Sequence, residues 1–408
     1  MNTQPSGALQ TVLTGEQAEL MHEMYRHLHA NPELSMQERA TAAYIGKQLD
    51  TMGIENFVCG GTGVVGIQRN GEGPVVGFRA DTDGLPIAED TGASYASEAR
   101  GQLADGTDVP VMHGCGHDTH VTAALTAAAR LAEQTGAWNG TIVWIFQPGE
   151  ETSAGARAML EDGLWDKAPV PSVILGQHVF PFAAGSVGLT SGPAMAMADS
   201  LKVTLHGKQS HGSQPQDSID PIVQGAHTIT RLQSLVSREL HPQTPAVLTC
   251  GSFHAGLKEN IIPDRAEFTL NIRTFDEQTR TQILDGVSRI VSAEAAASNA
   301  PAPEIETLNS FPKLHNDPGH TEQVKEALSR ELGEGKVVDL PAAMGSEDFG
   351  ALGDEISVPY VYWFFGGFLP RDEAPPVNHS PYFLPDYELS LATGVRAALA
   401  GLGHYLAR

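Results

Sequence analysis

Long apolar runs alternate with amphipathic segments in the first and last parts of the chain. Continuous apolar stretches are typical of strands buried on both faces, and four occur at residues 74–80, 141–146, 173–178 and 359–365. A helical apolar stripe at 37–49 and an Ala-rich segment at 118–134 predict helices in the same region. Buried strands separated by helices predict an α/β layered domain, with a mostly parallel central sheet flanked by helices.

The middle of the chain follows a different pattern. Half-exposed strands and amphipathic helices are predicted in the order β-α-β-β-α-β, at residues 200–206, 221–240, 246–250, 266–273, 277–297 and 304–308. This order is that of an α+β ferredoxin-like domain. We therefore expect one domain formed by residues 1–191 and 309–408, with a second domain inserted at 192–308. A cleft between two such domains is a common place for an active site.

Composition narrows the class of partner. The chain has 408 residues and a formal net charge of −24, which disfavours nucleic acid and anionic membranes as partners because both would repel it. No apolar run reaches membrane-spanning length, and the N-terminus lacks the pattern of a signal peptide. Cys59, Cys115 and Cys250 do not form a disulfide framework. We expect a cytoplasmic protein that acts on a small molecule.

Residue types that bind metals gather in two short motifs. Cys115 and His117 lie within Met112–His120, and Gln147–Glu151 ends in the adjacent carboxylates Glu150 and Glu151. Cysteine, histidine and carboxylate are ligands for zinc, manganese and similar ions, and a metal-bound water needs a carboxylate base beside it. An exposed acidic pair at a helix start is the alternative for the two glutamates. Adjacent side chains point in different directions, however, so one could bind metal while the other faces water.

Three more residues extend this set. His178 and His379 each lie in a Gly/Pro context, where either alone could be a structural histidine. Together they could complete the coordination of two ions. Asp83 follows the predicted strand at 74–80 and could orient a ligating histidine through its other ring nitrogen, unless it is a solvated turn residue. The ligands are dispersed along the chain, unlike those of a closed structural zinc site, and this favours a metallohydrolase.

Several motifs occur in the order found in one known superfamily. The chain resembles the dinuclear metallopeptidases and aminoacylases, most closely the N-acyl-amino-acid amidohydrolases, a branch that includes hippurate hydrolases and auxin-conjugate hydrolases. The motifs span nearly the whole chain and are His29–Ser35, Arg79–Ile87, His113–His120, Gln147–Glu151, Ser210–Pro215, Asn260–Pro263 and Gly345–Phe349. Leu270 and Asn271 depart from the family, which more often has a Gly-Thr pair before the residues matching Ile272 and Arg273.

The resemblance implies a role for each candidate residue. It implies that two divalent metal ions (Zn, Mn or Co) are held by Cys115, His117, Glu151, His178 and His379. Glu150 would be the general base. The inserted domain would be a lid and dimerisation domain of a homodimer, with His211, Asn260 and Arg273 reaching the substrate. Taken alone, His211 could be a turn histidine and Arg273 a surface charge.

We therefore expect metal-dependent hydrolysis of the amide bond of N-acyl amino acids to a carboxylic acid and a free amino acid. A related aminopeptidase or dipeptidase would instead need a polar or anionic pocket for a free α-amino group. A catalytically silent metal-containing protein would lack a ligand or the base, and neither is missing. Five residues hint at an apolar acyl pocket, namely Phe180, Phe182, Met195, Met197 and Phe365. The acyl group, the amino acid and the native metal stay open.

Overall fold

The computed structural model describes residues 9–370 and 372–408. The chain forms two compact units, and unit 2 consists of Met195–Leu314 and Ala343–Glu347. Unit 1 contains the chain up to Ala194 together with His315–Ala342 and Asp348–Arg408. The short segment Ala343–Glu347 belongs to unit 2 because the backbone N–H of Ala196 donates to carbonyl groups within it, at 2.9 and 3.1 Å.

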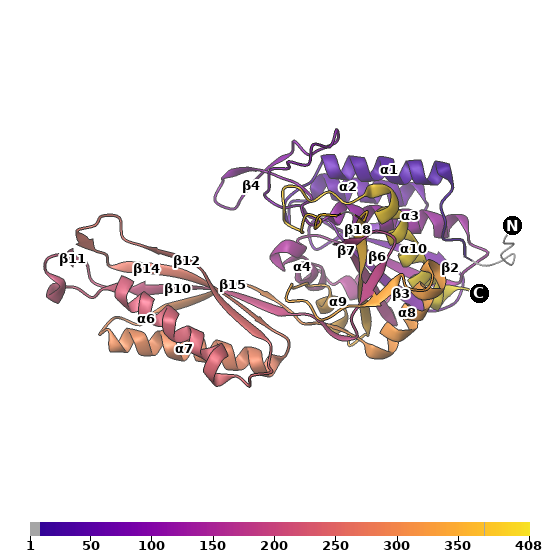
Figure 1. Cartoon of the computed structure of the whole chain (residues 1–408). Coiled ribbons are helices and arrows are strands. Elements are labelled where there is room, and N and C mark those ends of the chain that lie inside the picture. The colour runs from indigo at the N-terminus through magenta and orange to yellow at the C-terminus, as the bar shows by residue number, and fades with distance from the viewer. Residues whose placement is uncertain (1–8, 371) are drawn as a thin grey trace. The chain divides into compact units, whose positions relative to one another are not determined.

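Unit 1 is built on an eight-stranded sheet with the strand order β1-β2-β6-β3-β7-β18-β8-β17 (Figure 1). The strands are β1 (Glu55–Cys59), β2 (Gly63–Asn70), β3 (Val75–Asp81), β6 (Gly140–Gln147), β7 (Val173–Ala183), β8 (Val187–Leu189), β17 (Val337–Asp339) and β18 (Tyr360–Phe368). The central strands β6, β3, β7 and β18 are mutually parallel. These four are the apolar runs identified in the sequence, and the predicted α/β class is confirmed.

Helices cover both faces of this sheet. The main core lies on the face covered by α1, α3 and α10, where Trp144, Trp363 and Phe365 are fully buried. The helices are α1 (Gly15–Ala30), α2 (Arg39–Thr51), α3 (His117–Glu133), α4 (Gly155–Glu161), α5 (Leu164–Lys167), α8 (Pro318–Leu332), α9 (Gly350–Asp354) and α10 (Tyr387–Leu406), with the 3-10 turn η1 (Glu150–Thr152). Four short strands complete the unit or lie at its junctions: β4 (Arg100–Gln102), β5 (Asp108–Pro110), β9 (Gly192–Met195) and β16 (Leu314–Asn316).

Unit 2 is a four-stranded antiparallel sheet with α6 and α7 packed on one face (Figure 1). The strand order β12-β14-β10-β15, with the chain order β-α-β-β-α-β, is the ferredoxin-like arrangement. Its elements are β10 (Met197–His206), β11 (Ser210–His211), η2 (Pro215–Asp217), α6 (Pro221–Ser234), the π-helical turn η3 (Leu235–Glu239), β12 (Ala246–Ala255), β13 (Ile261–Ile262), β14 (Arg265–Thr274), α7 (Glu277–Ala297) and β15 (Glu304–Phe311). Buried and partly exposed residues alternate along β14, as in a strand with one covered face.

None of the helices that the structure describes has the length and apolar character that crossing a membrane requires.

Candidate metal centre

The carboxyl ends of three parallel strands bring the candidate residues of unit 1 together. Asp81 ends β3, Glu150 follows β6, and His178 lies within β7, next to β3. Parallel strands end at the same edge of a sheet, which is where open α/β folds bind ligands. The start of α3 brings Cys115 and His117 to the same edge.

Gly116 makes the close approach of Cys115 and His117 to the sheet possible. Its φ is 82°, in the left-handed region that favours glycine. A Cβ atom at this position would lie only 2.4 Å from Cγ1 of Val179 on β7. Any other residue would therefore push the loop before α3 away from the strand that carries His178.

The imidazole of His117 is buried, and one of its two ring nitrogens makes a hydrogen bond. Its Nδ1 lies 3.1 Å from Oδ1 of Asp83. Burial would raise the pKa of Asp83, but the hydrogen bond and charge of His117 and the hydrogen bond from Ser35 together lower it. Nε2 of His117 has no hydrogen-bond partner among the described residues. This nitrogen lies 3.7 Å from a carboxylate oxygen of Asp81, 3.8 Å from Glu151 and 4.0 Å from Glu150.

The remaining candidate ligands lie beside His117. Sγ of Cys115 is 3.4 Å from Nε2 of His178, and Nε2 of His379 is 3.3 Å from Oε1 of Glu151. The Nδ1–H of His178 donates to the carbonyl of Val179 at 2.6 Å, which leaves the lone pair of Nε2 toward Cys115. Donor atoms of Cys115, Glu151 and His379 all lie within 4.8 Å of one another, as do those of His117, Glu150 and Glu151.

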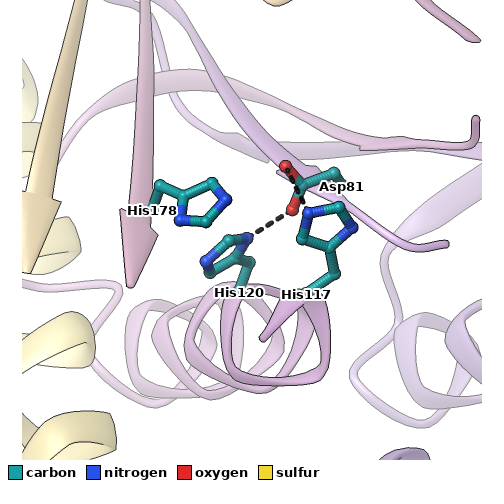
Figure 2. Close-up of side chains that lie close together, drawn as sticks. All are labelled: Asp81, His117, His120 and His178. Carbon is teal, nitrogen blue, oxygen red and sulfur yellow. Dashed lines mark hydrogen bonds and ion pairs between the residues drawn. The ribbon is translucent and has the colours of Figure 1, made fainter. Parts of the chain in front are cut away.

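Figure 2 shows a second histidine, His120, beside His117 and hydrogen-bonded to Asp81. His120 and Asp81 also form a close group with His117 and His178. However, the Val179 N–H donates to Nε2 of His120 at 2.8 Å, so its Nδ1 must carry the proton that hydrogen-bonds to Asp81. Burial lowers the pKa of His120, which favours this neutral form. Both nitrogens are in use, and His120 has none left for a metal.

The electrostatics of the cluster suit a cation. Burial disfavours a charged imidazole, but Asp81, Asp83 and Glu151 together raise the pKa of His117 to about 10. Burial and the carboxylates of Glu151 and Glu150 raise the pKa of the Cys115 thiol well above its usual range. A bound cation would reverse both effects, because it replaces the proton on each ligand. Nε2 of His117 and Oε1 of Glu151 are buried and make no hydrogen bond within the described part of the chain, which fits divalent metal ions.

Two buried carboxylates hold these loops in place, and only one of them, Asp83, was expected near the site from the sequence. Glu38 is fully buried and accepts hydrogen bonds from the N–H of Gly149 at 2.8 Å and the hydroxyl of Thr62 at 2.6 Å. In the sequence Glu38 looks like an ordinary acid at the start of a helix. Asp83 accepts from the N–H of Glu151 at 3.1 Å and the hydroxyl of Ser35 at 2.7 Å. Each carboxylate thereby positions one end of the turn that carries Glu150.

Arg79 anchors a second buried network beneath the cluster. Its guanidinium donates to Asp81 at 2.6 Å, to Gln147 at 3.0 Å and to Asp348 at 3.3 Å. Gln147 also donates to Asp348 at 2.6 Å. A charged residue within the apolar run at 74–80 was the available signal for this network, since a buried charge requires partners.

In unit 2, the structure brings His211 and Asn260 together but not Arg273. His211 pairs with Ile261, the residue after Asn260, and the Gly212 N–H donates to the Asn260 carbonyl at 2.8 Å. Arg273 lies near the opposite end of β14, where Nε donates to Oδ1 of Asn271 at 2.9 Å. Its Nη1 donates to the Met344 carbonyl at 2.6 Å.

Of the residues expected in an acyl pocket, Phe180 lies near His178, whereas Phe365 and Met197 do not line a surface. Phe180 is 38% exposed, and its ring centroid lies 5.0 Å from that of Phe364, which in turn lies 6.3 Å from that of His178. Phe365 and Met197 are buried core residues, so the expectation fails for them. Phe365 is on the opposite face of the sheet because side chains alternate along a strand.

Comparisons with known proteins agree with this geometry. Residues 77–400 match the family described as Peptidase family M20/M25/M40. An N-acetyl-L-cysteine deacetylase of Bacillus subtilis is 37% identical over 84% of this chain and 79% of its own length. A hippurate hydrolase of Campylobacter jejuni is 34% identical over 95% of this chain and 96% of its own.

A solved structure shows the same fold over nearly the whole chain. It is a Bacillus subtilis protein described as a dinuclear metal binding peptidase from the M20 family. The TM-score is 0.76 and the identity 30%, covering 95% of this chain and 99% of that one. The resemblance seen in the sequence is thereby confirmed, and the chain belongs to peptidase family M20/M25/M40 as a hydrolase of that family.

Proposed function

We propose that this chain is a metal-dependent amidohydrolase that cleaves N-acyl amino acids to a carboxylic acid and a free amino acid. The observation that carries the proposal is the buried Nε2 of His117, which has no hydrogen bond with any described residue and faces Glu150 and Glu151. The two relatives named above support the substrate class, because one is a deacetylase of an N-acetyl amino acid and the other a hippurate hydrolase.

The proposed ligands of two divalent ions are Cys115, His117, Glu151, His178 and His379. The free lone pairs of His117 and His178, and the distances among the five side chains, support this set. When bound, the ions would supply Lewis acidity at the scissile carbonyl and lower the pKa of a water molecule. Asp83 would orient His117 through Nδ1, as partners of ligating histidines commonly do.

Glu150 is the proposed general base. Its side chain is buried, and its Oε2 lies 4.0 Å from the ligating nitrogen of His117. It would take a proton from the attacking water and then deliver that proton to the leaving nitrogen. The hydrogen bonds from Gly149 to Glu38 and from Glu151 to Asp83 fix the turn on both sides of Glu150, which supports a role that requires exact placement.

The residues of unit 2 are proposed to bind substrate. We propose that residues 192–308 act as a lid and as the dimerisation domain of a homodimer. His211 would stabilise the oxyanion and Arg273 would bind the carboxylate of the amino acid, with Asn260 beside them. The hydrogen bond from Arg273 to Asn271 supports a fixed guanidinium, even though Asn271 departs from the family pattern.

The acyl group is proposed to be apolar. The exposed ring of Phe180, two residues after His178, packs on the buried ring of Phe364, and together they form an apolar surface. A peptidase is the second candidate, because the related structure named above is described as one. Such an enzyme would need an acidic partner for the substrate's free α-amino group.

Amine release from a panel of substrates tests the proposed function. The panel would contain acetyl, benzoyl, long-chain acyl and indole-acetyl amino acids and, as the peptidase control, dipeptides with a free amino group. The protein would be stripped of metal and then reloaded with Mn, Co or Zn. We expect metal-dependent turnover of N-acyl amino acids and none of the dipeptides. Turnover of dipeptides alone would replace the proposal with the peptidase.

A further inference from the structure

Asn378 lies against the sulfur of Cys115, although the two residues are 263 positions apart in the chain. Its Nδ2 is 3.7 Å from Sγ of Cys115, 3.3 Å from the carbonyl oxygen of Cys115 and 3.5 Å from that of Val179. All three neighbours are hydrogen-bond acceptors, and an N–H group is a donor that a sulfur ligand can accept. The carboxamide therefore faces the candidate metal centre with its donor end.

The orientation of this carboxamide follows from its surroundings. Its Oδ1 is buried and has no hydrogen-bond partner among the described residues. A flipped amide would place that oxygen against the carbonyl oxygens of Cys115 and Val179, which repel it. The Asn378 side chain is therefore held by the contacts of its Nδ2 group, and one of these contacts is with the sulfur of Cys115.

The backbone next to Asn378 docks on the same loop. His379 has a φ of 66°, a conformation that is unfavourable for residues other than glycine. Its N–H donates to the carbonyl of Gly114 at 2.8 Å, directly before Cys115. Asn378 and His379 thus attach the C-terminal loop to the Cys115 loop through a side chain and a backbone group.

We propose that Asn378 is a positioning residue that donates an N–H···S hydrogen bond to Cys115 and so ties the sulfur and His379 into one metal site. This inference rests on the proposed function, because it takes Cys115 and His379 as ligands. The hydrogen bond withdraws electron density from the sulfur and leaves the ions more electrophilic. Hydrogen bonds around a ligating sulfur are a known means by which proteins tune a metal.

The test is the spectrum and the cobalt affinity of the full-length protein reloaded with Co²⁺. Asn378→Leu keeps the branched shape of the side chain but removes the donor, and Asn378→Asp is a second variant of nearly the same size as asparagine. We expect the sulfur-to-cobalt charge-transfer band to move to lower energy in both. For Asn378→Leu we also expect cobalt to bind about tenfold more weakly, because the Cys115 and His379 loops are no longer tied together. Val377→Ala is the matched control in the same loop, because Val377 is 63% exposed, and it should change neither quantity.

Two results would overturn the inference. One leaves the proposed metal ligands in place, and the other removes Cys115 from them. An unchanged band energy in both folded Asn378 variants would remove the N–H···S role and leave the proposed ligands and hydrolysis untouched. Absence of a sulfur-to-cobalt band in the parent protein would remove Cys115 from the ligand set and this inference with it. Amine release by the cobalt-loaded parent separates either result from a failure of the proposed function.

Discussion

His29, a buried histidine outside the metal cluster, makes the stability of the fold depend on pH. His29 lies between Asp118, at 2.6 Å, and Glu89, at 3.1 Å, and all three side chains are buried. Burial disfavours the charged ring, but the hydrogen bonds with Asp118 and Glu89 outweigh it and raise the pKa of His29 to about 9. The folded protein therefore holds a proton that the unfolded chain releases at a pH of about 6.5.

We expect this ion pair to stabilise the protein at low pH and to lose its effect as pH rises. Its contribution should be complete below about pH 6.5 and disappear as pH rises through about 9, because the folded state binds the extra proton. His29→Gln should remove up to roughly 3 kcal/mol at pH 6 and little at pH 9.5. Urea unfolding of both proteins across this range measures the difference, and an equal loss at every pH would contradict the assignment.

Replacing Phe180 should change the selectivity of the enzyme between substrates. Phe180→Ala removes an exposed ring near His178 without touching a proposed ligand. We expect kcat/KM for N-benzoyl amino acids to fall about tenfold relative to N-acetyl amino acids, since an aromatic contact contributes roughly 1 kcal/mol or more. Phe182→Ala serves as the neighbouring control, with a smaller effect. An unchanged ratio would place the acyl group elsewhere.

The turn between β6 and α4 depends on residues from other elements. Glu38 begins α2, yet both of its carboxylate oxygens bind groups far away in the chain, on Gly149 and Thr62. The strand at 141–146 was predicted correctly because its apolar run is a local feature. The sequence analysis did not predict Glu38 as the support of the turn, since a glutamate's burial is decided by what packs around it and not by its neighbours in sequence.

Removing this support should weaken both the fold and catalysis. Glu38→Ala would leave the N–H of Gly149 and the hydroxyl of Thr62 without their acceptor, at a cost of about 1–3 kcal/mol. We expect kcat to fall with little change in KM, because the turn that carries Glu150 loosens. Urea midpoints and steady-state kinetics check both effects, with Lys47→Ala, at an exposed position on α2, as a control. Normal kcat in the folded Glu38 variant would show that the turn holds itself.

At the scale of the whole molecule, the order of elements was predictable and the network of buried charges was not. The four apolar runs of the sequence correspond to the central parallel strands, and the alternating strands of the middle segment correspond to the ferredoxin-like sheet. The edge strand β1 and its neighbour β2 were missed because β1 is short and mostly not buried and β2 carries two glycines among its apolar residues. The sequence also did not show that Ala343–Glu347 groups with unit 2, since backbone hydrogen bonds across the chain decide that.

Metal removal should destabilise the molecule as a whole. The proposed site gathers several carboxylates and a thiol, so without cations these groups repel one another or must hold protons. We expect the stripped protein to unfold at a temperature several degrees lower, since a ligand at about 100 times its Kd adds about 2.7 kcal/mol. Scanning calorimetry with stripped and reloaded protein measures this. Cys115→Ser should show a smaller gain on reloading, and an equal gain would argue against Cys115 as a ligand.

The most direct test of the account is to measure amine release and metal content in the same sample of Glu150→Gln. The substitution keeps the shape of the side chain but removes its ability to accept the proton of water. We expect two ions per chain, as in the parent, and turnover of N-acyl amino acids reduced by at least about a hundredfold. Full turnover, or loss of the metal together with activity, would contradict the division of labour between Glu150 and Glu151.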